Sequence, residues 1–368
     1  MLLHRLEAGR PQQSMIVTGL RGVGKTVLLN AFRDVAIERG WTAVDAEVTK
    51  NADFADRMSR LTRRALFSLS STENWKDRAR RAAAALKSFT VTFKPDGSIA
   101  TGLNVDALSG IADSGDMSED LTDVFIALGE AAGEEGTGVV FLLDEVQYLS
   151  SIELEALISA LHKTVQRALP ITMVAAGLPQ IPRLAGEAKS YSERLFTFPR
   201  IGRLGERDAR DALVLPALEL DVDFESDAAR RVVELTEGYP YFIQEYGRLV
   251  WDNARESPVT LPDVDRVAPL VDEQLDESFF RVRAGRATPL ELQYLRAMAE
   301  LGPDAHMAGE VAELLNRTSE QLGPTRASLI DKGLLYTPSR GLAAFTVPQF
   351  DRHMKRNYRL EPPPIRRR

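Results

Sequence analysis

The chain has 368 residues, 44% of them hydrophobic and 27% charged, a balance typical of a globular protein with about two or three domains. Its formal net charge of −7 argues against indiscriminate binding to polyanions and leaves room only for local basic patches. It has no cysteine, four scattered histidines and no apolar run near the ~20 residues of a membrane span, so the sequence predicts no disulfide, zinc site or membrane helix. The N-terminus lacks the apolar core of a signal peptide, and we expect a cytoplasmic protein.

The first patterned segment leads from a strand at residues 14–18 into a helix at 25–39. The loop between them matches the phosphate-binding pattern G-x-x-x-x-G-K-[ST] and reads Gly19, Leu20, Arg21, Gly22, Val23, Gly24, Lys25 and Thr26. Its glycines let backbone N–H groups turn inward around an anion, and the next helix begins at its positive dipole end. We expect this loop and Val27 to bind a nucleotide, with Lys25 at the phosphates and Thr26 on Mg²⁺.

Strands alternate with helices through the first ~200 residues, which predicts a parallel, three-layer sheet. The further predicted elements are a strand at 41–48, helices at 53–70 and 119–132, a strand at 139–143, a helix at 151–167, a strand at 171–176 and a short strand near 196–199. An insertion at about 71–117 contains a basic helical stretch, 75–87. Polarity then alternates on both sides of Pro95-Asp96-Gly97, which predicts a β-hairpin over 88–103.

The uninterrupted apolar run at 139–143 predicts a strand buried on both faces, and Asp144 and Glu145 end it. Carboxylates at the carboxyl end of a central strand lie where an open α/β sheet binds its ligand. We expect Asp144 to hold Mg²⁺ through its water shell and Glu145 to polarise the attacking water. Taken alone, the pair also suits the acidic first turn of a helix.

These two motifs together resemble the Walker A and Walker B pair of additional-strand P-loop ATPases. More narrowly, most of the chain resembles AAA+ and STAND ATPases of the origin-recognition-like and archaeal-ATPase type. The resemblance implies an α/β fold, namely a P-loop NTPase three-layer parallel sheet of the additional-strand type, followed by an all-α lid and a C-terminal winged helix-turn-helix. The expected boundaries are 1–202 for the core with its insertion, 203–284 for the lid, 285–360 for the winged helix and 361–368 for a disordered tail.

Two later segments carry this resemblance further. Ser192-Glu193-Arg194 is similar to the AAA+ segment whose arginine reaches a neighbouring subunit's site, which makes Arg194 an arginine-finger candidate for catalysis. An exposed surface arginine is the alternative. Gly238-Tyr239-Pro240 looks like the G-x-P signature of STAND ATPases, in which the proline (here Pro240) approaches the nucleotide base. The same three residues also suit a turn that ends one helix and starts the next.

The chain departs from the family pattern after the strand at 171–176. AAA+ proteins commonly place a polar sensor residue there, whereas this chain continues Ala176-Gly177-Leu178-Pro179. The absence of a polar residue here does not affect the prediction of nucleotide binding, but it argues for slow hydrolysis.

Nucleic-acid contacts are a further implication of the resemblance, in the insertion and in the winged helix. The candidates are Lys76, Arg78, Arg80, Arg81 and Lys87 in the insertion, Arg326 and Lys332 on the third helix, and Arg340 on the wing. Residues 288–368 carry 12 Lys and Arg against 9 Asp and Glu, a weak electrostatic footprint for a DNA reader. The basic stretch also suits a solvated helix face, the hairpin could pair with a partner's sheet edge, and winged helices also bind proteins.

The sequence therefore predicts an ATPase switch that uses ATP and Mg²⁺ and couples nucleotide state to double-stranded DNA binding. A homo-oligomer through Arg194 and protein partners are further expectations, and a membrane is not. One alternative is a STAND-like signalling ATPase whose winged helix and insertion bind proteins. Another is a nucleotide sensor with little turnover.

Overall fold

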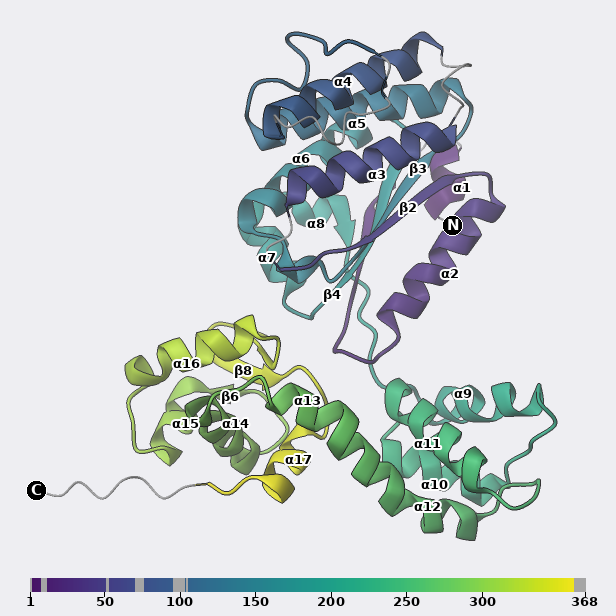
Figure 1. Ribbon diagram of the computed structural model, residues 1–368, viewed down its shortest axis with the longest axis vertical. Coiled ribbons are helices and arrows are strands. Elements are labelled where there is room, and N and C mark those ends of the chain that lie inside the picture. Colours follow the sequence, from purple (N-terminus) through teal and green to yellow (C-terminus); the bar gives the residue numbers. More distant parts are fainter. Residues whose placement is uncertain are drawn as a thin grey trace, which may run out of the picture. The chain divides into compact units, whose positions relative to one another are not determined.

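The computed structural model describes residues 2–7, 12–50, 53–69, 76–94, 103 and 105–360 (Figure 1). The chain divides into two compact units. One comprises Met1–Gly19 and Lys25–Arg200, and the other comprises Leu20–Gly24 and Ile201–Arg368. Among the described residues, no helix combines the length and apolar character that crossing a membrane requires.

The first unit is built on a five-stranded sheet with the strand order β2-β3-β4-β1-β5. The strands are β1 (Ser14–Thr18), β2 (Thr42–Glu47), β3 (Val139–Asp144), β4 (Ile171–Gly177) and β5 (Phe196–Thr197). Every pairing between them is parallel, which confirms the predicted sheet. Because β4 separates β1 from β3, the loop after β1 and the residues after β3 lie at one carboxyl edge, on either side of β4.

Helices cover both faces of this sheet (Figure 1). They are α1 (Leu2–Glu7), α2 (Lys25–Glu38), α3 (Phe54–Leu69), α4 (Asp77–Phe93), α5 (Met117–Glu134), α6 (Ser151–Gln166), α7 (Ile181–Ala188) and α8 (Ser192–Leu195). Successive β3 side chains point to opposite faces. Val140 and Leu142 pack in the cluster that contains α2, whereas Phe141 and Leu143 pack with α3, α5 and α6. The three layers follow from this alternation.

The predicted hairpin over 88–103 is wrong in its first half, because residues 88–93 complete helix α4. The alanine-rich face of α4 and Phe89 are buried in the main core of the first unit. Thr90 donates its hydroxyl to the carbonyl of Leu86, one turn earlier in the helix, and the hydroxyl oxygen of Ser88 contacts the carbonyl of Ala84 and the backbone of Leu108. Burial of this face therefore outweighs the β-propensity of the Thr-Val-Thr run. The predicted turn and most of the second strand lie outside the described residues.

The second unit begins with helices where a lid was expected. They are α9 (Glu206–Leu218), α10 (Ser226–Thr236), α11 (Pro240–Asn253), α12 (Leu261–Gln274), the π-helical segment η3 (Leu275–Phe280) and α13 (Arg281–Ala284). Valines of α12 and aromatic residues of α11 and η3 share its core. This amphipathic packing explains why the sequence pattern identified the region as helical.

A winged helix completes the second unit. Its elements are α14 (Pro289–Leu301), β6 (His306–Met307), α15 (Ala308–Leu314), α16 (Ser319–Asp331), β7 (Leu335–Tyr336), β8 (Leu342–Phe345) and α17 (Phe350–Asn357). The strands form an antiparallel sheet in the order β6-β8-β7, with the predicted wing turn between β7 and β8. Capping boxes at Thr288 and Thr318 start α14 and α16.

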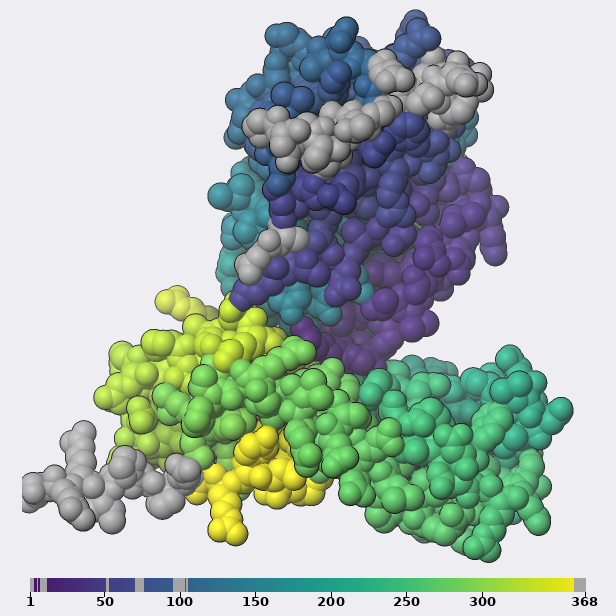
Figure 2. All heavy atoms as spheres, in the orientation of Figure 1, coloured from purple at the N-terminus to yellow at the C-terminus, as the bar shows by residue number. Residues whose placement is uncertain are grey.

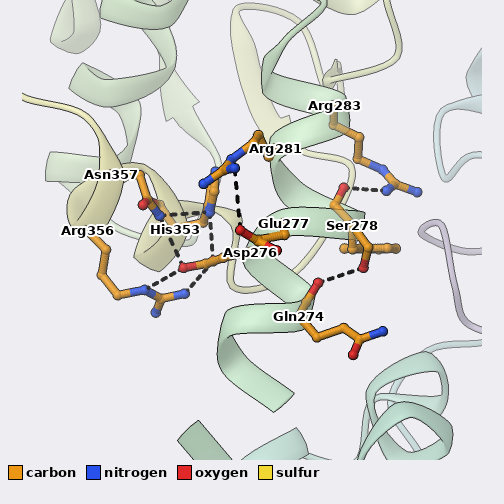
Figure 3. A network of polar contacts seen from close by, with 10 residues as sticks. Gln274, Asp276, Glu277, Ser278, Arg281, Arg283, His353, Arg356 and Asn357 are labelled. Carbon is orange, nitrogen blue, oxygen red and sulfur yellow. Dashed lines mark hydrogen bonds and ion pairs between the residues drawn. The ribbon is translucent and has the colours of Figure 1, made fainter. Parts of the chain in front are cut away.

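A polar network joins the π-helical segment to α17 (Figure 3). Asp276 on η3 accepts hydrogen bonds from three side chains of α17, those of His353, Arg356 and Asn357. Burial alone would raise the pKa of Asp276, but these donors lower it. The ring of His353 is itself buried, which lowers its pKa, so the imidazole is neutral near pH 7. The network anchors the last helix to the end of the lid segment.

An ion pair joins two helices of the winged helix, α14 and α16. Lys332, at the end of α16, donates to the buried carboxylate of Glu291 in α14 at 2.6 Å. Burial would raise the pKa of Glu291, but the hydrogen bonds from Lys332 and from the backbone of Thr288 lower it to about 2. The carboxylate is therefore charged in the folded protein and depends on its partners.

We expect the winged helix to lose stability in acid and on loss of either partner. Because the pKa of Glu291 is lower in the folded chain than in the unfolded chain, its contribution is complete above about pH 5 and disappears as the pH falls toward about 2. Lys332→Met leaves a buried charge without its partner and costs about 3–5 kcal/mol. Hydrogen exchange of α14 peptides in the full chain measures both effects. In Glu291→Gln the dependence on pH between about 5 and 2 becomes weaker, and an unchanged dependence would contradict the assignment.

Candidate nucleotide-binding site

The phosphate-binding loop has the backbone its sequence predicts. Gly22 and Gly24 adopt φ angles of +82° and +89°, in the left-handed region that favours glycine. Lys25 opens α2, and its buried ammonium donates to the carbonyl oxygen of Gly19 at 3.1 Å. The Gly19 N–H donates to the carbonyl of Gly177 at 3.1 Å, which ties the start of the loop to the end of β4. A cationic group held by a backbone carbonyl can turn to a phosphate when one arrives.

Thr26 and Asp144 meet at the same edge of the sheet. The Thr26 hydroxyl donates to Asp144 Oδ2 at 2.5 Å. A hydroxyl has one donor and two acceptor lone pairs, so this bond leaves the oxygen able to ligate a cation. The second carboxylate oxygen of Asp144 accepts the N–H of Glu145 at 2.8 Å. The two residues predicted to serve Mg²⁺ are therefore in direct contact.

Glu145 adopts the left-handed conformation, with φ +56° and ψ +37°. This conformation is uncommon for a non-glycine residue and is found at functional sites. The carboxylate accepts a hydrogen bond from the side-chain amide of Gln147, in the 3₁₀ turn η2 (Val146–Tyr148). The oxygen of that amide accepts the N–H of Leu178 at 3.1 Å. Gln147 thus joins the predicted water-activating residue to the end of β4.

A cavity of about 140 Å³ lies beside Thr26 and Asp144. Two further carboxylates, Asp45 and Glu47 of β2, line it, and so does the guanidinium of Arg33 in α2, so three carboxylates face one cation there. In the described part of the chain, no three His, Cys, Asp or Glu side chains converge on a ready-made metal site. Mg²⁺ suits this arrangement, because it is usually held by one or two protein groups together with phosphate oxygens and water. The residues present fit ATP–Mg²⁺.

The tip of the loop, Leu20–Gly24, packs within the second unit. The hydroxyl of Tyr239 donates to the carbonyl of Arg21, and the N–H of Tyr241 donates to the carbonyl of Gly22 at 3.1 Å. A Cβ at Gly22 would lie 3.1 Å from Tyr241 Cβ and 3.2 Å from a ring atom of Tyr239. The two tyrosines flank Pro240, which occupies the first turn of α11. The G-x-P segment is thus a helix-initiating turn, and its neighbouring aromatic residues hold the loop tip.

Arg194 lies exposed on the short helix α8. Its backbone carbonyl accepts a hydrogen bond from Gln13 at 3.0 Å. An exposed arginine next to the last strand of the sheet can contact a neighbouring subunit, but exposure is equally expected of an ordinary surface arginine. Its role remains a prediction.

The nucleic-acid candidates fall into two sets. Helix α4 lies at the surface of the first unit (Figure 2). Arg78, Arg80 and Arg81 are exposed on this helix, although Arg78 also donates to the carbonyl of Glu130 at 3.5 Å, and Arg340 is exposed on the wing. The others make contacts inside their own unit. Lys76 pairs with Glu135 at 3.1 Å, and Lys87 donates to the carbonyl of Val105 at 2.5 Å. Arg326 donates to the carbonyl of Leu342 at 2.7 Å, and Lys332 is held by Glu291.

The sequence interpretation missed the roles of Gln147 and of the two tyrosines. Gln147 is a polar residue inside an otherwise apolar turn, two positions after Glu145, and this placement was the available signal. Tyr239 and Tyr241 gave no separate signal, because aromatic residues beside a helix start are ordinarily core.

Two family models match separate parts of the chain. The model of the AAA ATPase domain matches residues 1–174, and a model described as a domain of unknown function (DUF8462) matches residues 277–354. A search of curated proteins found no significant match.

Several solved structures are similar over nearly the whole chain. A Walker-type ATPase of Pyrococcus abyssi is 17% identical, with 93% of this chain and 90% of that chain covered and a TM-score of 0.53. The RuvB Holliday junction branch migration motor of Thermotoga maritima (15% identity, 98% and 92% covered) has a TM-score of 0.45. The ORC1 protein of Aeropyrum pernix, in complex with DNA (14% identity, 97% and 90% covered), has a TM-score of 0.41. At this identity the Pyrococcus structure establishes a shared fold alone.

We expect the Thr26 hydroxyl to matter only when Mg²⁺ accompanies the nucleotide. Thr26→Ala removes a metal ligand and should weaken ATP binding in Mg²⁺ by about tenfold, which is about 1.4 kcal/mol. Thr26→Ser keeps the hydroxyl and is the matched control. Calorimetric titration with ATP in Mg²⁺ and in EDTA measures the difference. Equal affinities of Thr26→Ala and wild type in Mg²⁺ would contradict the role given to Thr26.

Proposed function

We propose that this chain is an ATP-binding and ATP-hydrolysing switch whose nucleotide state controls its C-terminal winged helix, and the match of residues 1–174 to the model of the AAA ATPase domain supports this. The observation that carries this proposal is the contact of Thr26 with Asp144 at 2.5 Å, at the sheet edge that also presents Lys25 and Glu145. A chance glycine-rich turn would not require a hydroxyl and a carboxylate from segments 118 positions apart to meet.

Each group then has a role in hydrolysis. Lys25 leaves the Gly19 carbonyl and neutralises charge on the β- and γ-phosphates. Thr26 and Asp144 hold Mg²⁺, which when bound offsets the charge that develops on the phosphates. Glu145 accepts a proton from the attacking water, and one of its carboxylate oxygens is already fixed by Gln147.

Arg194 completes the site from a second copy of the chain in this proposal. A guanidinium from the second copy would stabilise the negative charge that develops on the transferring phosphate during hydrolysis. Support comes from the exposure of Arg194 on α8, where it can reach a neighbour. The switch is then coupled to assembly.

A mixing experiment tests this shared site. Glu145→Gln and Arg194→Ala each lower the rate of phosphate release by roughly 10³-fold or more in this account. A mixture restores up to about a quarter of the wild-type rate, because some interfaces pair an intact Glu145 with an intact Arg194. Glu187→Gln, a change at an exposed residue of α7, is the control and retains full activity. If the mixture is as inactive as its components, Arg194 does not act between subunits. A wild-type rate equal to that of Glu145→Gln would instead favour a sensor without turnover.

We propose that the nucleotide state of this switch controls binding to double-stranded DNA. The supporting observations are the winged-helix topology and the two exposed basic sets, Arg340 on the wing and the three arginines of α4. Such cations bind phosphates and position a protein on a duplex without reading its sequence. ATP binding would then change how these two surfaces meet DNA.

A specific observation favours a second candidate, in which the winged helix binds a protein. The two cations of α16 are occupied, since Lys332 pairs with Glu291 and Arg326 donates to the carbonyl of Leu342. A recognition helix whose cations are held inside the fold has few groups left for base edges. Winged helices serve both purposes, so fold alone does not decide.

Fluorescence anisotropy with duplex DNA separates these outputs. DNA binding predicts a measurable affinity at low salt that differs between ATP and ADP. Replacing Arg78, Arg80 and Arg81 with alanine should lower the salt slope, d log K/d log[salt], by up to about three. Arg207→Ala, which removes a highly exposed arginine of α9, is the matched control. If the chain has no affinity for DNA in either nucleotide state but binds a protein partner when ATP is present, the winged helix binds a protein and not DNA.

A further inference from the structure

The side chain of Gln147 lies at the end of β4, where the sequence itself has no polar residue. Ala176-Gly177-Leu178-Pro179, at the end of β4 and just after it, carry no polar side chain. The amide of Gln147 reaches this point from the opposite direction, out of the turn after β3, and its oxygen accepts the Leu178 N–H at 3.1 Å. The polar group at the end of β4 is therefore supplied by its neighbouring strand.

Gly177 provides the space for this amide. A Cβ at Gly177 would lie 3.0 Å from Gln147 Oε1, 2.8 Å from Ile181 Cγ1 and 3.1 Å from Val146 Cγ2. The first of these neighbours is the atom that bonds Leu178. A side chain at position 177 would crowd Ile181 and this amide oxygen, so the glycine leaves the room that the Gln147 amide occupies.

The two bonds of Gln147 also fix its orientation. Its NH₂ faces the carboxylate of Glu145, and its carbonyl oxygen faces a backbone N–H. The reversed amide would place an acceptor against the carboxylate and a donor against the N–H, which satisfies neither. Glu145 therefore has one oxygen held by a donor of defined direction and the other left for water.

We propose, on the premise of the hydrolysis described above, that Gln147 is the positioning residue of Glu145 and couples it to the end of β4. Gln147 touches neither nucleotide nor water in this proposal. It holds the carboxylate in place, and it transmits to Glu145 any movement of the segment that leads from β4 through α7 to α8 and Arg194. Contact with a neighbouring subunit would in this way reach the water-activating group.

Steady-state kinetics of the full chain test the positioning role. Gln147→Ala should lower kcat by about 10–100-fold and leave KM and ATP affinity within about twofold, because a misplaced group costs rate rather than binding. Gln166→Ala, which removes an exposed amide of α6, is the control and retains the wild-type kcat. A wild-type kcat in Gln147→Ala overturns the proposal. So does a parallel loss of ATP affinity and thermal stability, which would mean a merely structural role.

Hydrogen exchange separates failure of this inference from failure of the proposed function. In the nucleotide-free chain, Gln147→Ala removes the acceptor of the Leu178 amide, whose exchange should become about tenfold faster. Glu145→Ala should also speed it severalfold, because it frees the other end of Gln147. These results hold even if the wild type hydrolyses no ATP. Unchanged Leu178 exchange in Glu145→Ala overturns the coupling even where ATP is hydrolysed.

Discussion

The hydrogen bond from Thr26 to Asp144 is the contact on which the proposed chemistry depends. It joins the first turn of α2 to the end of β3 and so fixes the phosphate-binding loop relative to the sheet. The strand order makes it available, because β1 lies next to β4 and β4 next to β3, with every strand parallel. The alternation of apolar side chains that buries both faces of β3 therefore also sets the position of Asp144.

Much of this arrangement could be predicted from the sequence, because local signals and tertiary packing agree there. The strand, loop and helix around Gly19–Thr26 and the apolar run before Asp144 each form the predicted element. The hairpin prediction failed because residues 88–93 bury an alanine-rich helix face, and no local pattern reports what packs against a segment. The pairing of Lys332 with Glu291 could not be predicted either, since it joins residues 41 positions apart.

The lack of a polar residue after β4 suggested slow turnover. In the structure, the amide of Gln147 occupies that position and reaches Glu145 and Leu178 together. The turn after one strand can therefore supply a polar group at the end of the neighbouring strand when a glycine leaves room for it, as Gly177 does. A search for a polar residue directly after β4 does not find this amide, because Gln147 lies two positions after Glu145 in the sequence.

A crystal structure of the full chain with Mg²⁺ and a non-hydrolysable ATP analogue tests the central claim most directly. The account predicts Mg²⁺ on the Thr26 hydroxyl with Asp144 still accepting its hydrogen bond. It also predicts Lys25 on the phosphates, and a water within hydrogen-bond distance of a Glu145 carboxylate that Gln147 still holds. A nucleotide whose phosphates lie outside the loop, or a metal ion bound where Thr26 and Asp144 have separated, would contradict it.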